Sequence, residues 1–153
     1  MLRLLNRALV ASFYQQHAGL FLVVFYLLFG AVEGSQIVSY QKSLLLAVSS
    51  SPIILFIVLF IWLLYGFKCV HFINKKQTDD AYSFLQALNT LPKNKQYRLW
   101  AYVYGMCFLP ILIYAILIVI MAISNGHILT TIVTPVFMIG LISLAAKYTY
   151  LQA

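Results

Sequence analysis

The sequence predicts an all-α, polytopic integral membrane protein with about four transmembrane helices, an N-terminal interfacial helix and a short inner amphipathic helix. The stretch from Leu99 to Ala146 contains no Asp, Glu, Lys or Arg and is interrupted only by the polar segment Ser124–His127. Each half is long enough to cross a bilayer core, which takes about 20 apolar residues in a helix. The chain is 63% hydrophobic and only 8% charged, unlike an average soluble domain. We therefore expect residues 1–153 to form a single transmembrane helical domain.

Residues 1–14 predict an amphipathic helix that lies on the membrane surface. At 3.6 residues per turn, Arg3 and Arg7 fall on one side of this helix. The opposite face is apolar and carries Leu2, Leu5, Leu9 and Phe13. Arginine above an apolar face suits the boundary between headgroups and acyl chains. The alternative is that this helix is a plain N-terminal extension of the first span.

The first and second spans are expected at residues 18–38 and 48–70. The apolar run that ends at Val32 is short for a full crossing, so span one is expected to continue beyond it. Pro52 suits the first turn of span two or a kink within it. The segment 33–51 mixes polar and apolar residues. We favour a short outer loop with an early start of span two over a segment that bends through the interface.

The polar loop after span two contains the expected inner amphipathic helix at residues 79–91. Thr78 can cap its start, and the carboxylates of Asp79 and Asp80 favour the positive end of the helix dipole. Its apolar face follows the helical repeat and carries Ala81, Phe84, Leu85 and Leu88. Pro92 ends the helix.

Spans three and four are expected at residues 99–123 and 128–146. Pro110 and Pro135 lie within them. Prolines are tolerated in transmembrane helices because neighbouring groups can satisfy the carbonyl that a proline leaves unpaired. The dipeptide Asn125-Gly126 predicts a tight turn between the two antiparallel helices.

Basic residues flank the spans and predict the orientation of the chain. With four spans, the N-terminus and the loop between spans two and three lie on the same side of the membrane. The basic residues expected at this membrane surface are Arg3, Arg7, Lys75, Lys76, Lys93, Lys95 and Arg98. The positive-inside rule then predicts that both ends of the chain lie on the inner side of a bacterial inner membrane. The net charge of +7 therefore indicates contact with membrane lipids rather than with nucleic acid, because the basic residues form no single patch.

The sequence carries no recognisable catalytic or metal-binding pattern, so we expect neither an enzyme nor a bound cofactor or metal. His17, His71 and His127 have no metal-ligand spacing, and none of the seven glycines belongs to a GxxxxGK[ST] phosphate loop. Glu33 is the acidic residue closest to an apolar span. It is expected either as an interfacial residue or as part of a transport pathway. The two cysteines are expected as packed thiols.

The order of these elements resembles the membrane subunit of an ABC-2-type exporter. In that family, an interfacial helix, two spans, a short inner helix and further spans follow one another. The segment Phe13–Gly19 before an aromatic-rich span, with Gly34–Gln36 after it, also resembles uncharacterised bacterial permease-like proteins. Members of the family usually have six spans in each half. The resemblance therefore implies that this chain is the N-terminal part of a longer protein.

The resemblance implies a permease-like subunit of a transporter that is driven by a separate ATPase, within a homo- or hetero-oligomer. The inner helix would act as a coupling helix, with Phe84, Leu85 and Leu88 against the ATPase. The aromatic-rich spans would suit an amphiphilic cargo such as a lipid or a hydrophobic peptide. The alternative is a non-catalytic membrane anchor or assembly subunit of a larger complex, whose inner helix simply lies on lipid.

Overall fold

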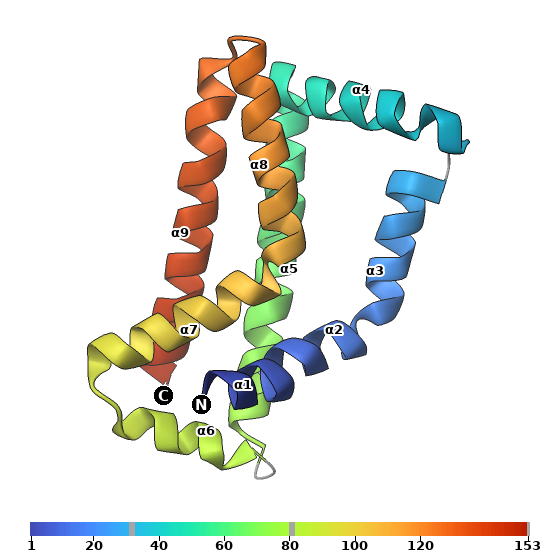
Figure 1. Ribbon diagram of the computed structural model, residues 1–153. Helices are drawn as coiled ribbons and strands as arrows, with labels where there is room; N and C mark the ends of the chain where they lie inside the picture. The colour runs from blue at the N-terminus through green and yellow to red at the C-terminus, as the bar shows by residue number, and fades with distance from the viewer. Residues whose placement is uncertain (31–32, 80–81, 153) are drawn as a thin grey trace.

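The computed structural model describes residues 1–30, 33–79 and 82–152, and the regular elements within these residues are all helices. Figure 1 shows long helices that run nearly side by side and form a bundle. The bundle helices are α5 (Pro52–Gln77), α8 (Leu109–Ser124) and α9 (Ile128–Gln152). A second group of helices stands beside the bundle, meets it at one end through α4 and continues at the other end into α2 (Figure 1). This group, which we call the arm, consists of α3 (Ala18–Phe25), the π-helical η2 (Tyr26–Gly30) and α4 (Ile37–Ser50).

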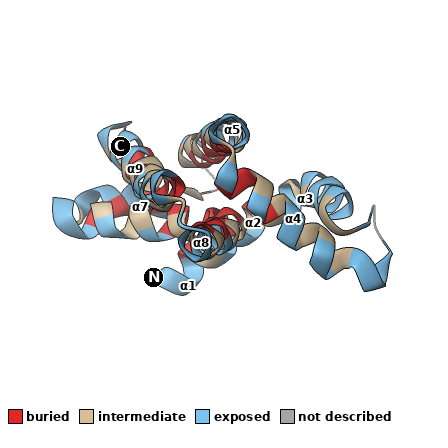
Figure 2. Cartoon of the chain, turned by 90° about the horizontal axis from the view of Figure 1, so that it is seen from above, coloured by how far each residue is buried: buried red, intermediate tan, exposed pale blue. Residues whose placement is uncertain are grey.

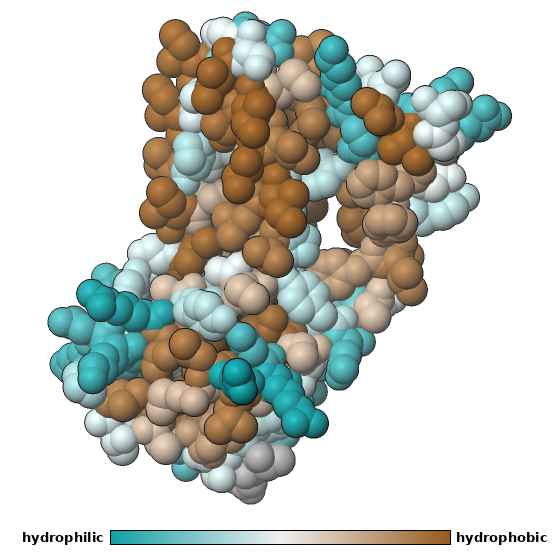
Figure 3. All heavy atoms as spheres, viewed as in Figure 1, coloured by the Kyte–Doolittle hydropathy of each residue, from teal (hydrophilic) through white to brown (hydrophobic). Residues whose placement is uncertain are grey.

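The length and apolarity of the helices support a membrane protein. Two helical stretches, Pro52–Gln77 and Ile128–Leu151, are each long and apolar enough to cross a membrane, and two bent helix pairs raise the number of candidate spans to four. Large apolar side chains cover the outer surface of the bundle (Figure 3). Phe56 on α5 is 71% exposed and Ile139 on α9 is 70% exposed. Lipid-facing helices need such a surface, whereas a soluble monomer rarely exposes one.

The N-terminal helix forms a rod that packs against protein. The rod consists of α1 (Leu2–Leu5), the π-helical η1 (Asn6–Ala11) and α2 (Ser12–Gln16). It ends at His17, where the chain turns by 57° into the arm. Three residues of the predicted apolar face, Leu5, Leu9 and Phe13, lie in the protein core and leave at most 1% of their surface exposed. These three side chains of the face that was expected to enter lipid find their apolar contacts within the chain, whereas Leu2, the fourth, is 48% exposed.

The arm differs from the favoured expectation for residues 33–51. Helix α4 runs across one end of the bundle as a separate helix and is not an early start of α5 (Figure 1). The break lies at Ser51, whose backbone is extended (φ −103°, ψ 116°). A residue before proline is driven out of the helical region, and Pro52 then occupies the first turn of α5, where its missing N–H leaves no bond unmade. The expected span at 18–38 is likewise interrupted, because Glu33 is extended before the 3₁₀ turn of Gly34–Gln36.

The expected third span at residues 99–123 is two helices rather than one. Helix α7 (Lys93–Cys107) meets α8 at an angle of 74°, with Phe108 at the bend. Pro110 lies in the first turn of α8. It has no N–H, and its ring clashes with the carbonyl four residues earlier, so a proline favours a kink or a break in the helix at this point. Helix α7 therefore runs across the lower part of the bundle while α8 runs along it (Figure 1).

The expected inner helix at residues 79–91 is shorter in the structure. It comprises α6 (Phe84–Ala87), which continues as the 3₁₀ turn η5 (Leu88–Thr90). Asp80 and Ala81, which were expected in its first turn, lie outside the described residues. Thr78 donates its hydroxyl to the carbonyl of Lys75, at 2.9 Å, so it closes α5 instead of capping a following helix.

The link between α8 and α9 confirms the predicted turn. Gly126 has a positive φ of 74°, and the N–H of His127 bonds the carbonyl of Ala122 at 2.9 Å. Glycine is suited to this left-handed position because it has no Cβ. Pro135 lies inside α9 without ending it.

Candidate functional site

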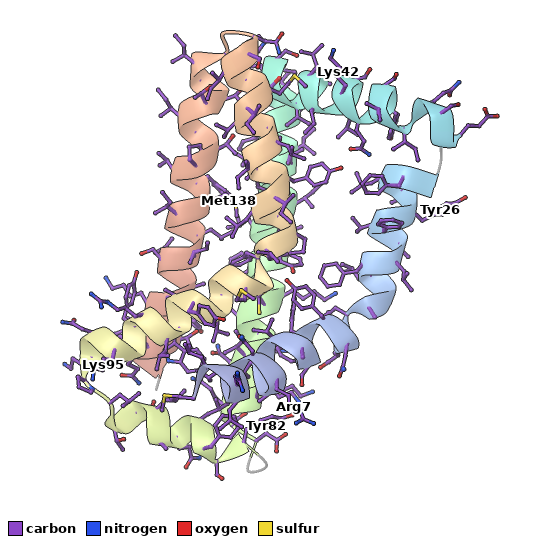
Figure 4. All side chains as sticks on the ribbon, viewed as in Figure 1. Arg7, Tyr26, Lys42, Tyr82, Lys95 and Met138 are labelled. Atoms are coloured by element: carbon purple, nitrogen blue, oxygen red, sulfur yellow. The ribbon has the colours of Figure 1, made fainter. Side chains whose placement is uncertain are left out.

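The basic side chains gather at one end of the molecule, which we call the basic end. Figure 4 places Arg7 and Lys95 at this end and Lys42 at the opposite end. Figure 3 shows a hydrophilic surface at this end and a second group of hydrophilic residues at the far upper end of the arm. Lys75 and Lys76 lie in the last turn of α5, which reaches the same end. The other basic residues predicted at this surface are exposed, namely Arg3, Arg7, Lys93, Lys95 and Arg98. The basic end therefore combines the N-terminal rod, the end of α5, and α6 with α7.

Helix α6 lies at the basic end with one face inward and one face outward. Phe84 is 37% exposed, whereas Leu85 and Leu88 are 1% and 2% exposed and belong to the core. Gln86 and Ala87 are also exposed. Of the three residues predicted to contact a partner, Phe84 is accessible, while Leu85 and Leu88 hold α6 to the rest of the chain. The apolar repeat correctly marks one face of this helix, but that face is turned inward.

Polar contacts tie both ends of the α6 segment to the long helices. The ammonium of Lys76 on α5 donates to the hydroxyl of Tyr82 at 3.1 Å and lies 4.5 Å from the centre of its ring. The amide of Gln96 on α7 donates to the side-chain oxygen of Asn89 at 2.9 Å. The rings of Tyr82 and Phe84 also lie close together, with centroids 6.3 Å apart, which is within the range of about 4.5–7 Å for aromatic pairs. The α6 segment is therefore attached to α5 on one side and to α7 on the other.

The bend at Pro110 is stabilised by two tyrosines from other helices. In a straight helix, the N–H of residue 110 would bond the carbonyl of Met106, and proline has none. Tyr14 donates its hydroxyl to that carbonyl at 2.6 Å. Tyr65 on α5 donates to the next carbonyl, that of Cys107, at 2.7 Å. The bend thus joins the N-terminal rod, α5 and α7 at one point.

Helix α7 is also joined to α9 by pairs of hydroxyl groups. Tyr104 shares a hydrogen bond with Thr149, and both side chains are fully buried. Tyr97 and Ser143 form a second pair at 2.8 Å. Trp100 lies on α7 between Tyr97 and Tyr104, and its side chain is 1% exposed. Helix α7 is therefore held firmly to the bundle despite its polar N-terminal turn.

An apolar cavity of about 890 Å³ lies between the arm and the bundle. Helix α3 with η2 forms one wall, α5 and α8 form the other, and α4 contributes Leu44, Leu45 and Val48. Figure 2, viewed from above, shows α3 and α4 to one side of the bundle helices. Gln41 bridges the two walls near α4: its amide donates to the Leu28 carbonyl at 2.6 Å, and its oxygen accepts from the Tyr114 hydroxyl at 2.6 Å.

Glu33 and the histidines do not form a site with this cavity. Glu33 is exposed and lies at the start of the 3₁₀ turn before α4, and it does not line the cavity. Cys69 and Cys107 are buried free thiols. Among the residues that the structure describes, no three His, Cys, Asp or Glu side chains come together as a group that could hold a metal ion.

Sequence reasoning did not identify the bend or the tyrosines that support it. Pro110 was visible as a proline within an apolar run, and such a proline always leaves one carbonyl without its helical partner. A tyrosine in a neighbouring apolar helix is a suitable donor. With 11 tyrosines in the chain, only the packing of the helices decides that Tyr14 and Tyr65 take this role.

Comparisons with protein-family models, with curated proteins and with solved structures give no match for this chain.

Proposed function

We propose that this chain is a permease-like membrane subunit of a transporter that is driven by a separate ATPase. In this proposal it crosses a bacterial inner membrane four times, through α3 with η2, α5, α8 and α9. The rod, α6 and α7 then lie at the inner surface and α4 at the outer one, with both ends of the chain inside. The placement of the basic side chains at one end supports this orientation.

Helices α5 and α9 are long enough to cross a membrane, whereas α8 and α3 with η2 are short for a full crossing. Helix α8 has 16 residues and is about 24 Å long at the helical rise. This is shorter than the hydrocarbon core of roughly 30 Å, and a short span is accommodated by local thinning of the bilayer. Tyrosines and lysines at the span ends suit the headgroup region. The same surface side chains would contact lipid phosphates.

The position of α6 is the observation that carries the proposal. A coupling element must present an outward face to a soluble partner and must be attached rigidly to the spans. Phe84 provides the outward apolar contact, while Leu85 and Leu88 attach α6 from behind. The Lys76–Tyr82 and Gln96–Asn89 bonds join it to α5 and α7. A push on α6 would therefore reach the bend at Pro110 through α7.

The experiment is site-specific photo-cross-linking in the native membrane, with a photoreactive residue placed at position 84 or at position 85. We expect a nucleotide-binding ATPase to be cross-linked from the exposed position 84 and not from the buried position 85. In co-purification, Phe84→Asp should lose this ATPase, whereas Asn94→Asp, which changes another exposed residue of the basic end, should retain it. If the ATPase co-purifies equally with the Phe84→Asp variant, or if no ATPase is found, the proposal is contradicted.

A non-catalytic anchor or assembly subunit is the second candidate function. The observation that favours it is the mixed character of the outward face of α6, where polar Gln86 and Asn89 accompany Phe84. An anchor would bind its complex through the spans instead. In the same experiment, it would co-purify with a membrane complex that contains no ATPase, and Phe84→Asp would have no effect on that complex.

A further inference from the structure

We propose that the cavity between the arm and the bundle holds an acyl chain of a bilayer phospholipid, which completes the packing of the arm. This inference rests on the membrane placement of the proposed function but not on an ATPase partner. The acyl chain would be a permanent component of the folded protein, because it fills a space that the polypeptide leaves open between the arm and the bundle.

The chemistry of the cavity wall selects an apolar occupant. Three tyrosines line it, and each hydroxyl is already used: Tyr14 and Tyr65 donate to backbone carbonyls, and Tyr114 donates to Gln41. Most of the remaining lining is aliphatic or phenylalanine. Water needs several polar partners to occupy a cavity, and apolar cavities stay dry. A void would also cost the lining its dispersion contacts, so a hydrocarbon occupant stabilises this arrangement.

The openings of the cavity are continuous with the apolar outer surface. Leu22 and Phe25 on α3 line the cavity and are 69% and 62% exposed. Ile61 on α5 and Ile113 on α8 line the opposite wall and are 55% and 53% exposed. Side chains that line the cavity and are also exposed on the outer surface mark a lateral opening of the cavity. An acyl chain can therefore enter from the bilayer without crossing a polar region.

The size of the cavity suits a small hydrocarbon occupant. The cavity has about 890 Å³, which is within the range of roughly 300–1,000 Å³ found for small-molecule sites. The volume of the cavity and its apolar lining therefore agree with an acyl chain as the occupant.

The two tryptophans of the chain provide a direct test. Trp62 lines the cavity, and Trp100 lies in the core of α7, away from its lining. The test uses Trp100→Phe, which keeps Trp62, and Trp62→Phe, which keeps Trp100. Each variant is purified in detergent and titrated with phosphatidylcholine that is brominated on its acyl chains, because bromine quenches tryptophan fluorescence at short range. We expect Trp62 fluorescence to fall in a saturable manner and Trp100 fluorescence to change little.

A matched pair of variants separates the cavity from the general lipid surface. Val24 lines the cavity, whereas its neighbour Val23 is 60% exposed and does not. Val24→Phe should reduce the saturable quenching of Trp62, and Val23→Phe should leave it unchanged. The pair can be compared in the native two-tryptophan chain if Trp100→Phe does not fold. Equal quenching of both tryptophans, no effect of Val24→Phe, or quenching by a brominated fatty acid but not by the phospholipid would each overturn the proposal.

Discussion

Helices α3 and α7 each border a sharp bend, but they are stabilised in opposite ways. Helix α3 and η2 are strongly apolar and bury none of their side chains within the protein. Helix α7 begins with Lys93 and Lys95, yet it buries Trp100, Val103 and Tyr104 along with two further residues. Apolarity alone therefore does not indicate which helix forms the protein core. In a bilayer, an apolar helix can be covered by lipid, and the driving force for packing against protein is correspondingly weak.

The same contrast separates the arm from the bundle. The bundle is held by close side-chain packing, and α7 is joined to it by hydroxyl pairs such as Tyr104–Thr149. The described polar link between η2 and the bundle runs through Gln41. We therefore expect substitutions at the basic end to lower global stability and substitutions in the arm to act locally. The following predictions test this difference, beginning with the largest effect.

Phe13→Ala should cause the largest loss of stability. Its ring is fully buried and packs at 5.4 Å from the ring of Phe72 and at 5.9 Å from that of Tyr65. Removing a buried phenylalanine costs about 3–5 kcal/mol. The matched arm variant, Phe25→Ala, removes a ring that is 62% exposed and should have a small effect. Denaturation in detergent, followed by circular dichroism, measures both, and equal losses would refute the contrast.

Gly66→Val should destabilise the contact between α5 and α9. A Cβ at position 66 would lie 3.1 Å from a methyl carbon of Leu141, whereas a Cβ at Gly140 would meet nothing within 4 Å. Overpacking of this kind costs roughly 1–3 kcal/mol. Gly140→Val is the matched control, since both changes place the same side chain on a helix. The unfolding midpoint should fall for Gly66→Val and should fall less, or not at all, for Gly140→Val.

Tyr14→Phe should weaken the bend at Pro110 by about 1 kcal/mol, because it removes a hydrogen bond to the Met106 carbonyl, which no proline N–H can replace. Tyr26→Phe is the control, as Tyr26 is 64% exposed on the arm. The same denaturation measurement applies. A loss no greater than that of the control would show that the bend does not depend on this hydroxyl.

Gln41→Leu should release the arm without unfolding the bundle. The substitution leaves the Leu28 carbonyl and the Tyr114 hydroxyl without their present partner. A local loss of about 1 kcal/mol raises the population of the open state roughly fivefold. Hydrogen exchange should become faster in η2 and α4 and stay constant in α9. Faster exchange throughout the bundle would show that the arm is an integral part of the core.

Several features of the fold could be predicted from the sequence because they depend on local chemistry. The apolar runs predicted the candidate spans, since their length and composition are read directly from the chain. Asn125-Gly126 predicted the turn between α8 and α9, because a left-handed residue is needed there. The apolar repeat marked one face of the segment that contains Leu85 and Leu88. Each of these inferences needs only neighbouring residues.

The contact of Phe84, Leu85 and Leu88 with a partner stays a prediction. Phe84 is accessible, whereas Leu85 and Leu88 are in the core. A helical repeat shows that one face is apolar, and it contains no information on whether lipid, a partner or the same chain covers that face. The rod illustrates the same limit, since Leu5 and Leu9 were expected in lipid and lie in the core.

The sequence by itself determined that the chain is helical and strongly apolar, and that its basic residues flank the apolar segments, because these properties follow from residue type and spacing. The tertiary structure decided that Pro110 produces a 74° bend and that Tyr14 and Tyr65 satisfy the carbonyls beside it. It also decided that the arm stands apart from the bundle and encloses a cavity. These features depend on contacts between residues that are far apart in the chain, and hydrophobic attraction has no direction that could specify them in advance.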